Sequence, residues 1–265
     1  MTYNEHILGG ITMDLQSAPK SKIAYRHIGN ENSTHTLLFI HGAGGASDSL
    51  LDLALHFKDY NCILVDLPGH GQSVEDIPSS ITGYVDALEN FINSEKLLFK
   101  DNVTCIGHSM GGMITMNLAL RKIPVIKQIV ILNSSAKFNL DQKFISKIHK
   151  GILDKVYLFK ASGSYFHPRT YKFFLSSLKV LSDEVMIKDF RLIEDFSLID
   201  QIKNISVPTL IVTGEKEILA TPEDSRFMHS CIKDSELEIM PKLAHLLPII
   251  AHEKLAERMM QFLSK

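Results

Sequence analysis

The sequence has few cysteines and almost no net charge, and both properties limit the class of protein to which it can belong. Three cysteines among 265 residues make an odd number, and Cys62 and Cys105 lie in apolar runs where cysteine usually acts as a small hydrophobic residue. This usage suggests a reducing compartment. A net charge of -2, with scattered Lys and Arg, provides no basic field for nucleic acid or anionic lipid. We therefore expect no nucleic-acid partner.

Long apolar runs and targeting signals are missing as well. No stretch of about 18 apolar residues is present, and the opening MTYNEHILGG lacks the basic and apolar segments of a secretion signal. Internal repeats, low-complexity tracts and Pro/Gly-rich linkers are also absent. The sequence therefore predicts a cytoplasmic protein without stable membrane insertion, long enough for one large α/β domain.

Short apolar runs recur along the chain and alternate with segments of helical spacing. The runs are TLLFI (36–40), CILV (62–65), VTCI (103–106), IVIL (129–132), TLIV (209–212) and LEIM (237–240). Most are apolar throughout, as in parallel strands buried on both faces. The helical segments are 47–57, 79–98, 110–121 and 248–262. This order predicts βαβ units, with HILGGITM and KIAYRHIG as an antiparallel pair at one edge.

The alternation stops between residues 136 and 204. FISKIHKGILDKVYLF and TYKFFLSSLKVL space their apolar residues three and four apart, and Pro168 and Ser182 are suitable helix starts. We interpret 136–204 as a helical cap insertion, and 1–135 with 205–265 as the core. The position favours a cap, because the insertion falls where carboxyl ends of strands gather a site. The alternative is an ordinary set of packing helices.

A serine lies between two glycines where an apolar run gives way to a helical pattern. NVTCIGHSMGGMITMNL (102–118) carries Gly107, Ser109 and Gly111 as Gly-x-Ser-x-Gly. Between a strand and a helix, a strained turn lifts the serine hydroxyl clear of the sheet, and the glycines leave room for it. The positive end of the helix would stabilise a developing oxyanion. Ser109 is therefore the candidate nucleophile. The alternative interpretation is a turn that merely needs small residues.

Five motifs together resemble the α/β-hydrolase superfamily over nearly the whole chain outside the insertion. They are FIHGAGG (39–45), DLPGHGQS (66–73), GHSMGG (107–112), VPTLIVTGEKE (207–217) and MPKLAHLLPIIAHEKLAERMMQFL (240–263). The resemblance implies an α/β fold with a mostly parallel sheet, helices on both faces, and catalytic residues in the order Ser, acid, His. By position, it also implies an oxyanion hole made by the backbone amides of Ala43 and Met110.

His245 is the candidate general base. A serine hydroxyl needs a neighbouring imidazole to take its proton, and a carboxylate must hold that imidazole in one tautomer. His245 follows the LEIM run and precedes the helix opened by Pro248, which puts it on a loop at the carboxyl edge of the sheet. His229 and His252 fall inside predicted helices. The resemblance implies structural roles for the histidines at 41, 70 and 108.

Glu217 is the candidate acid and a departure from the family pattern. The family usually has Asp three residues after the glycine that ends the seventh strand, and Glu217 stands there, one methylene longer. Some members draw the acid from the end of the sixth strand, where this chain reads Asn-Ser-Ser (133–135) with no carboxylate. The remaining candidates, Asp195, Asp200, Asp224 and Glu215, are interpreted as surface charges.

These residues indicate a serine hydrolase that cleaves a small to medium carboxylic ester through an acyl-enzyme. A thioester, an amide, a C–C bond beside a carbonyl and a cofactor-free perhydrolase reaction remain open on the same residues. A non-catalytic ligand-binding homologue is the alternative from another class. Nothing resembles a metal site, a phosphate-binding Gly-rich loop or a nicotinamide fingerprint. No metal or cofactor is therefore expected, and the oligomeric state stays open.

Overall fold

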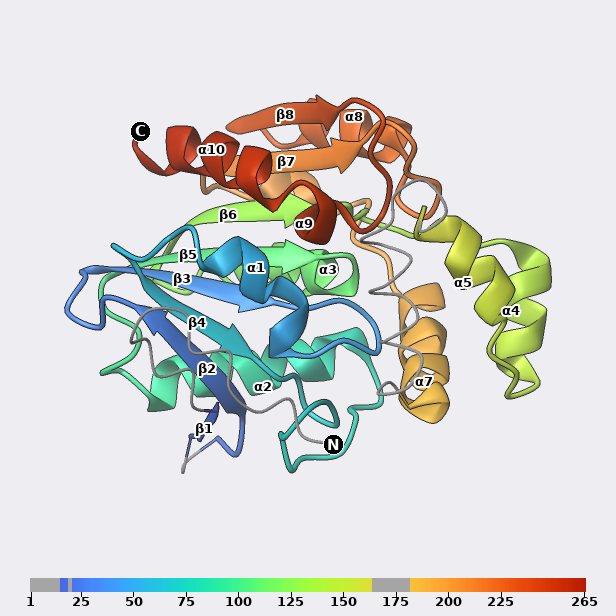
Figure 1. Ribbon diagram of the computed structural model, residues 1–265, viewed down its shortest axis with the longest axis horizontal. Helices are drawn as coiled ribbons and strands as arrows, with labels where there is room; N and C mark the ends of the chain where they lie inside the picture. The colour runs from blue at the N-terminus through green and yellow to red at the C-terminus, as the bar shows by residue number, and fades with distance from the viewer. Residues whose placement is uncertain (1–14, 19–20, 164–181) are drawn as a thin grey trace.

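The computed structural model describes residues 15–18, 21–163 and 182–265. An eight-stranded sheet in the order β1-β2-β4-β3-β5-β6-β7-β8 runs through the molecule (Figure 1). The strands are β1 Leu15–Ser17, β2 Ala24–Gly29, β3 His35–Ile40, β4 Asn61–Val65, β5 Asn102–His108, β6 Ile126–Leu132, β7 Thr209–Gly214 and β8 Ser235–Met240. Each of the six predicted apolar runs lies within one of β3 to β8.

The sheet is parallel from β4 to β8 and antiparallel only at the β1 edge. β2 pairs antiparallel with both β1 and β4, while the β4-β3, β3-β5, β5-β6, β6-β7 and β7-β8 pairs are parallel. KIAYRHIG includes β2, as expected. Its predicted partner HILGGITM (6–13) lies outside the described residues, and β1 pairs with β2 at the edge that the structure describes.

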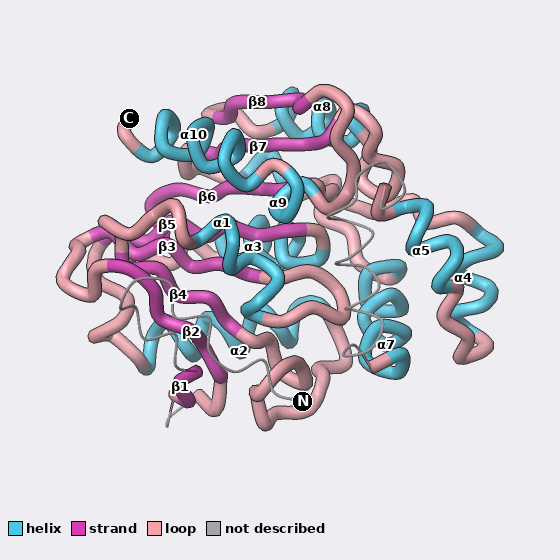
Figure 2. Tube along the Cα trace, in the orientation of Figure 1, coloured by secondary structure: helices cyan, strands magenta, loops and turns pink. Residues whose placement is uncertain are grey.

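Helices cover both faces of the sheet (Figure 2). The helical elements of the core are η1 Ser47–Leu50, α1 Leu51–Ala54, α2 Ile81–Ser94, α3 Met110–Leu120, η2 Ile202–Asn204, α8 Pro222–Cys231, α9 Leu247–Ile250 and α10 His252–Leu263. Apolar side chains of α2, α3 and α8 form one buried cluster with one face of the sheet. Those of α1 and α10 form a second cluster on the other face. The predicted fold class, α/β with a mostly parallel sheet between helices, is confirmed.

Two predicted helices are interrupted. The segment 47–57 forms η1 and the short α1 in place of one helix, and its first amide, Ser47 N–H, donates to Asp66 Oδ1 at 2.7 Å. The segment 248–262 divides at Ala251, whose φ of -123° and ψ of 27° are not helical.

Three described helices follow β6 and precede η2 and β7: α4 Gln142–His149, α5 Lys155–Ala161 and α7 Asp183–Glu194. Figure 1 draws them beyond the arrowheads of the central strands, at the carboxyl edge. Asp141 and Asp154 cap α4 and α5 by accepting backbone N–H groups. Ser182 caps α7, as the sequence predicts for a helix start. The predicted segment TYKFFLSSLKVL (170–181) and Pro168 lie outside the described residues.

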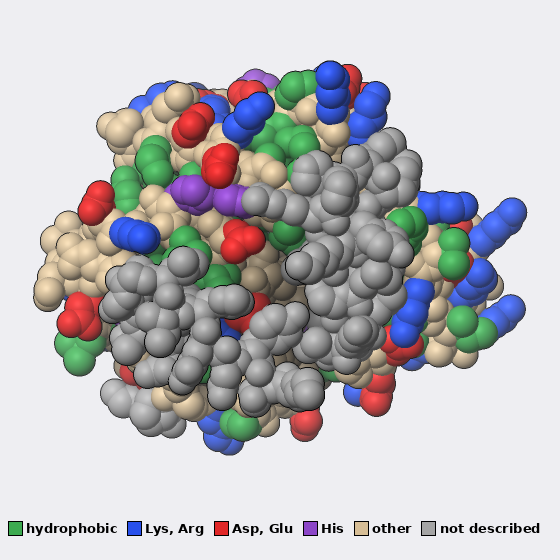
Figure 3. Space-filling view, viewed as in Figure 1, with side chains coloured by type: hydrophobic (Ala, Val, Ile, Leu, Met, Phe, Trp, Pro, Cys, Tyr) green, Lys and Arg blue, Asp and Glu red, His purple; other side chains and the backbone are tan. Residues whose placement is uncertain are grey.

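Charged side chains of both signs are spread over the visible face, with lysines gathered over α4 and α5 (Figure 3). In the sequence, α4, the residue after it and α5 carry Lys143, Lys147, Lys150, Lys155 and Lys160. Ion pairs join Lys147 to Asp154 at 2.6 Å and Lys155 to Asp183 at 2.9 Å, so part of this charge is compensated. No helix in the described ranges is both long and apolar enough to cross a bilayer.

Candidate active site

Ser109 occupies a strained turn between β5 and α3. Its φ of 56° and ψ of -121° fall outside the regions that non-glycine residues favour. A Cβ at Gly107 would collide with the Gly111 carbonyl, and one at Gly111 with the Ile40 carbonyl. Both positions therefore require glycine because backbone from neighbouring segments passes too close for a side chain. The turn thus holds a serine at the carboxyl edge of the sheet.

The start of α3 provides one candidate oxyanion donor. Met110 is the first residue of this helix, and the first amides of a helix have no carbonyl partner within it. Ser109 is 7% exposed and lies at the wall of a cavity. A negative oxygen formed there would face the helix N-terminus, whose partial positive charge favours it.

The loop after β3 provides the second candidate donor. Ala43 lines the same cavity as Ser109. A Cβ at the adjacent Gly42 would lie 2.9 Å from the Ser109 Cβ, so the loop passes directly against the nucleophile turn. The Ala43 N–H donates to no acceptor in the described part of the chain. This amide is therefore available to a ligand oxygen.

Glu217 and His245 form a buried hydrogen-bonded pair. His245 Nδ1 lies 2.6 Å from Glu217 Oε2, and Glu217 is only 3% exposed. Because the carboxylate accepts, the proton of a neutral ring lies on Nδ1 and leaves Nε2 as the acceptor. Oε1 accepts the amides of Leu219 at 2.7 Å and Ala220 at 3.4 Å. The glutamate is therefore held from both of its oxygens.

The loop that carries His245 is fixed from two other strands. Asn133, at the end of β6, donates from Nδ2 to the Ala244 and His245 carbonyls, each at 2.9 Å. Its Oδ1 accepts the Gly214 amide at 2.9 Å. His108 Nε2 donates to the His245 carbonyl at 2.8 Å. Burial, and then the charge of His245, lower the pKa of His108 to about 3, so this ring stays neutral and serves as a fixed donor.

Ser109 and His245 line one cavity of about 160 Å³. Its wall is mostly apolar and combines residues of the sheet edge with Phe138, Leu158, Met186 and Ile193, among others, from the segment before β7. Within the described residues, the Ser109 hydroxyl makes no hydrogen bond to His245. Such contacts are often loose in ligand-free enzymes and tighten with substrate.

The other carboxylates considered from sequence are exposed or hydrogen-bonded to other residues. Asp195 and Asp200 are exposed. Asp224 Oδ2 accepts from Thr221 at the start of α8, and Glu215 Oε2 accepts the Lys242 amide at 2.9 Å. Among the candidate acids, Glu217 alone is hydrogen-bonded to His245 within the described residues.

The other histidines considered from sequence have partners of their own. His229 Nδ1 lies 2.9 Å from the Ser235 hydroxyl, and His252 Nδ1 lies 2.8 Å from His56 Nε2. His41 Nδ1 donates to the Gly42 carbonyl, and its Nε2 accepts the Leu67 amide. Within the ranges that the structure describes, no three His, Cys, Asp or Glu side chains gather as a metal-binding group.

Sequence reasoning missed two residues that shape the site. Asn133 was considered only as a position without a carboxylate, yet its amide joins β6, β7 and the His245 loop. Asn tolerates the positive φ of 43° found here better than most residues do, so the residue type is the available sequence signal. Asp189 falls within the helical insertion predicted over 136–204, and no local pattern in the sequence marks it as buried.

The sheet order and the strand-turn-helix around Ser109 define the class of proteins that carry a nucleophile on an α/β-hydrolase sheet. A family model for the alpha/beta hydrolase fold matches residues 35–166. A solved structure, a lipase-esterase related protein from Clostridium acetobutylicum ATCC 824, is 35% identical, with a TM-score of 0.86. The similarity covers 91% of this chain and 99% of that one. The chain belongs to the α/β-hydrolase family.

Curated relatives agree with this assignment at lower identity. The uncharacterized hydrolase YugF of Bacillus subtilis (strain 168) is 25% identical, over 91% of this chain and 94% of the relative. A pimeloyl-[acyl-carrier protein] methyl ester esterase of Nitrosospira multiformis is 24% identical, over 79% and 87%. The expected class of enzyme, a hydrolase of the esterase and lipase type, is consistent with these similarities.

Proposed function

We propose that this hydrolase cleaves small to medium carboxylic esters with Ser109 as nucleophile, His245 as general base and Glu217 as the acid. The observation that carries the proposal is the buried 2.6 Å hydrogen bond from His245 to Glu217, beside a cavity that Ser109 also lines. A serine, a histidine and a carboxylate in this relation are the requirements of nucleophilic acyl transfer.

In the first half of the reaction, His245 Nε2 takes the proton of the Ser109 hydroxyl as Oγ bonds to the ester carbonyl carbon. Glu217 stabilises the imidazolium that forms and keeps the ring in the tautomer that can accept this proton. The carbonyl oxygen becomes an oxyanion and accepts from the Ala43 and Met110 amides. As the oxyanion re-forms the carbonyl, the alkoxide leaves with the proton from His245, and an acyl-Ser109 ester remains.

In the second half, water replaces the alcohol. His245 takes a proton from water as its oxygen bonds to the acyl carbon, and the same two amides hold the second oxyanion. Collapse of this intermediate breaks the bond to Ser109 Oγ, which recovers its proton from His245. The products are the free acid and the original enzyme.

The proposed substrate size follows from the cavity. A cavity of about 160 Å³ resembles in volume an engineered protein cavity of roughly 150 Å³ that binds benzene. Such a space suits a short acyl chain, and its apolar wall suits hydrocarbon. Because α5 and α7 supply part of that wall, we propose that residues 136–204 act as a cap over a core of 1–135 and 205–265. A cytoplasmic location and the absence of a nucleic-acid partner stay predictions.

The test of the proposed function is covalent labelling with a fluorophosphonate. Ser109 Oγ would displace fluoride from phosphorus, and one group should be added at Ser109, located by peptide mass spectrometry. Ser109→Ala should lose both labelling and turnover of p-nitrophenyl butyrate, since removal of a triad serine costs on the order of a million-fold in kcat. Ser135→Ala is the matched control and should label as the parent does.

Two results would contradict the proposal. Labelling that persists in Ser109→Ala would show a different nucleophile. A parent protein that neither reacts with the fluorophosphonate nor turns over activated esters, while still binding small apolar molecules, would favour the ligand-binding alternative.

A further inference from the structure

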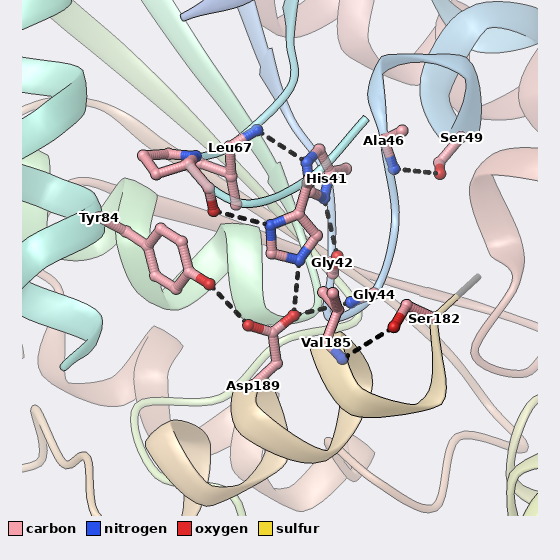
Figure 4. Close-up of polar contacts among 12 residues, drawn as sticks. His41, Gly42, Gly44, Ala46, Ser49, Leu67, Tyr84, Ser182, Val185 and Asp189 are labelled. Carbon is pink, nitrogen blue, oxygen red and sulfur yellow. Dashed lines mark hydrogen bonds and ion pairs between the residues drawn. The ribbon is translucent and has the colours of Figure 1, made fainter. Parts of the chain in front are cut away.

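The most connected buried charge in the described residues outside the proposed triad is Asp189, on α7. This carboxylate is 0% exposed and receives hydrogen bonds from three separate segments of the core (Figure 4). His70 Nε2 donates to Oδ2 at 2.8 Å, and the Tyr84 hydroxyl donates to Oδ1 at 2.7 Å. The third donor is the backbone N–H of Gly44, 2.8 Å from Oδ2.

The ring of His70 is arranged to be charged beside Asp189. Its Nε2 faces the Asp189 carboxylate, and its Nδ1 lies 3.0 Å from the Pro68 carbonyl. Both neighbours are acceptors, so both ring nitrogens donate, as only the imidazolium can. Burial by itself would lower the pKa of His70, but the hydrogen bond to Asp189 and its charge outweigh burial and raise that pKa. The pair is therefore a buried, fully hydrogen-bonded ion pair.

The Gly44 amide belongs to the loop that carries the candidate oxyanion donor Ala43. Gly44 has a φ of +64°, and a Cβ there would collide with Met186 on α7. The Gly42 carbonyl accepts from the Gly45 amide at 3.0 Å and from His41 Nδ1 at 2.8 Å. These bonds fix Gly42 and Gly44 on either side of Ala43, while the Ala43 N–H donates to no acceptor in the described part of the chain. Asp189 supplies the bond on the C-terminal side of Ala43.

We propose that Asp189 is a positioning residue for the oxyanion hole. By holding the Gly44 amide, it keeps the preceding Ala43 amide directed at the oxyanion, and it joins this loop to the helix that supplies Met186 and Phe190 to the cavity wall. The inference rests on the proposed function, because an oxyanion hole matters only if Ser109 attacks a carbonyl. Its contribution depends on geometry, since a misplaced donor loses much of its effect on the transition state.

The experiment compares substrate binding with binding of a transition-state analogue. A trifluoromethyl ketone forms a bond from its carbonyl carbon to Ser109 Oγ, the serine proton passes to His245, and the carbonyl oxygen becomes an oxyanion in the hole. The inhibition constant therefore reports on the hole, and KM for p-nitrophenyl butyrate reports mainly on the apolar cavity. Both are measured with kcat and the melting temperature.

Three variants separate positioning from simple anchoring of α7. Asp189→Leu keeps the branched shape but has no acceptor, whereas Asp189→Asn keeps an oxygen that Gly44 can reach. Tyr84→Phe removes the donor to Oδ1 and leaves the Gly44 bond intact, which makes it the matched control. We expect kcat to fall about 10- to 100-fold in Asp189→Leu, less than the loss of a whole oxyanion donor, which costs about 100- to 1,000-fold.

The remaining readouts should divide in the same way. The inhibition constant should rise in proportion to the loss of kcat in Asp189→Leu, and KM should change less than about threefold. Asp189→Asn should recover most of kcat but still raise the ratio of inhibition constant to KM about threefold, because a neutral acceptor binds the Gly44 amide less strongly than a carboxylate. Tyr84→Phe should lower the melting temperature and leave that ratio unchanged.

An unchanged ratio in every Asp189 variant that folds overturns the inference, and so does a raised ratio in Tyr84→Phe. If Asp189→Leu does not fold, Asp189→Asn carries the test through the same ratio. The parent protein is assayed first with the fluorophosphonate and the trifluoromethyl ketone. If the parent reacts with neither reagent, the proposed function and the inference are both wrong. If the parent reacts but the ratio is unchanged in the Asp189 variants, only the inference is wrong.

Discussion

At the scale of single residues, the proposed catalytic acid, Glu217, is the position at which this chain departs from the usual family pattern. Glu217 uses both carboxylate oxygens: Oε2 accepts from His245, and Oε1 accepts the Leu219 and Ala220 amides. The longer side chain is thus tied down at its tip by the loop that follows it. This arrangement explains how a glutamate can stand where an aspartate is usual. It also means that a substitution at position 217 disturbs the bond to His245 or the bonds to the loop.

Glu217→Gln should preserve the fold and lower kcat by about 100- to 10,000-fold, the scale found when a triad aspartate becomes asparagine. A glutamine has only one oxygen, so its NH2 group must face either the Leu219 amide or His245 Nδ1. The first placement loses the hydrogen bond from Leu219, and the second keeps a hydrogen bond to His245 only if the ring adopts the wrong tautomer. Glu217→Asp should also lose activity, because the shorter side chain cannot reach both partners. The measurement is kcat for p-nitrophenyl butyrate at equal melting temperature.

Asp195→Asn and Asp200→Asn are the controls, because both residues are exposed and neither takes part in the His245 hydrogen bond. Both should keep kcat within about twofold. Near-normal turnover in Glu217→Gln, together with a collapse in either control or in Asp224→Asn, would assign the acid to another carboxylate.

The sequence predicts residues whose role is marked by local chemistry and misses those whose role comes from distant partners. Ser109 sits in a short motif, and His245 and Glu217 follow predicted strands, so each has a local signal. Asp189 is bonded to residues 105, 119 and 145 positions away. Single-sequence patterns do not report such separations, which is why Asp189 was not singled out.

At the scale of secondary structure, continuous apolar runs predicted the parallel strands well because burial on both faces leaves a simple signal. Interruptions at the carboxyl edge were not predictable in the same way. The amide of Ser47 donates to Asp66 Oδ1, a bond across 19 positions that accompanies the division of the segment 47–57. This bond ties the start of the segment to a distant loop, which helical spacing in the sequence does not report.

The docking of α7 should depend on pH through His70. The pKa of His70 is raised in the folded protein, so the stabilisation is complete below the ordinary unfolded value of roughly 6.5 and is lost as pH rises through the folded value. Besides Asp189, the groups that face His70 are Asp66, His41 and Tyr84. Burial lowers the pKa of His41 to about 3 and raises that of Tyr84, so neither titrates in this window.

The measurement is the melting temperature of the parent and of His70→Gln between pH 6 and pH 10. We expect the parent to be more stable by several degrees at pH 6 and the difference to shrink steadily toward alkaline pH. His229→Gln, which alters a histidine on the surface, should show no such trend. A difference that grows with pH would mean that the His70 ring is neutral in the folded protein.

At the scale of the whole molecule, one cavity unites the core and the segment that precedes β7. Leu158 on α5 and Met186 on α7 line the same cavity as Ser109, so both parts of the chain shape this cavity. The sheet, with its nucleophile turn, was predictable because it is built from repeated local units. Which described residues before β7 form the wall was not predictable, because amphipathic spacing does not specify how a helix packs on the core.

Activated esters of increasing acyl length should therefore show an optimum at short to medium chains, with kcat/KM falling steeply beyond about twelve carbons. Leu158→Phe, which enlarges a wall residue, should shift the optimum toward shorter chains and lower kcat/KM for the octanoate about tenfold relative to the acetate, since one methylene in a pocket is worth roughly 10- to 200-fold. Val156→Phe, on the same helix but 65% exposed, should leave the profile unchanged. A strong preference for long chains, a steep rise in rate at an emulsion surface, or equal effects of the two Phe variants would show that this cavity does not hold the acyl group.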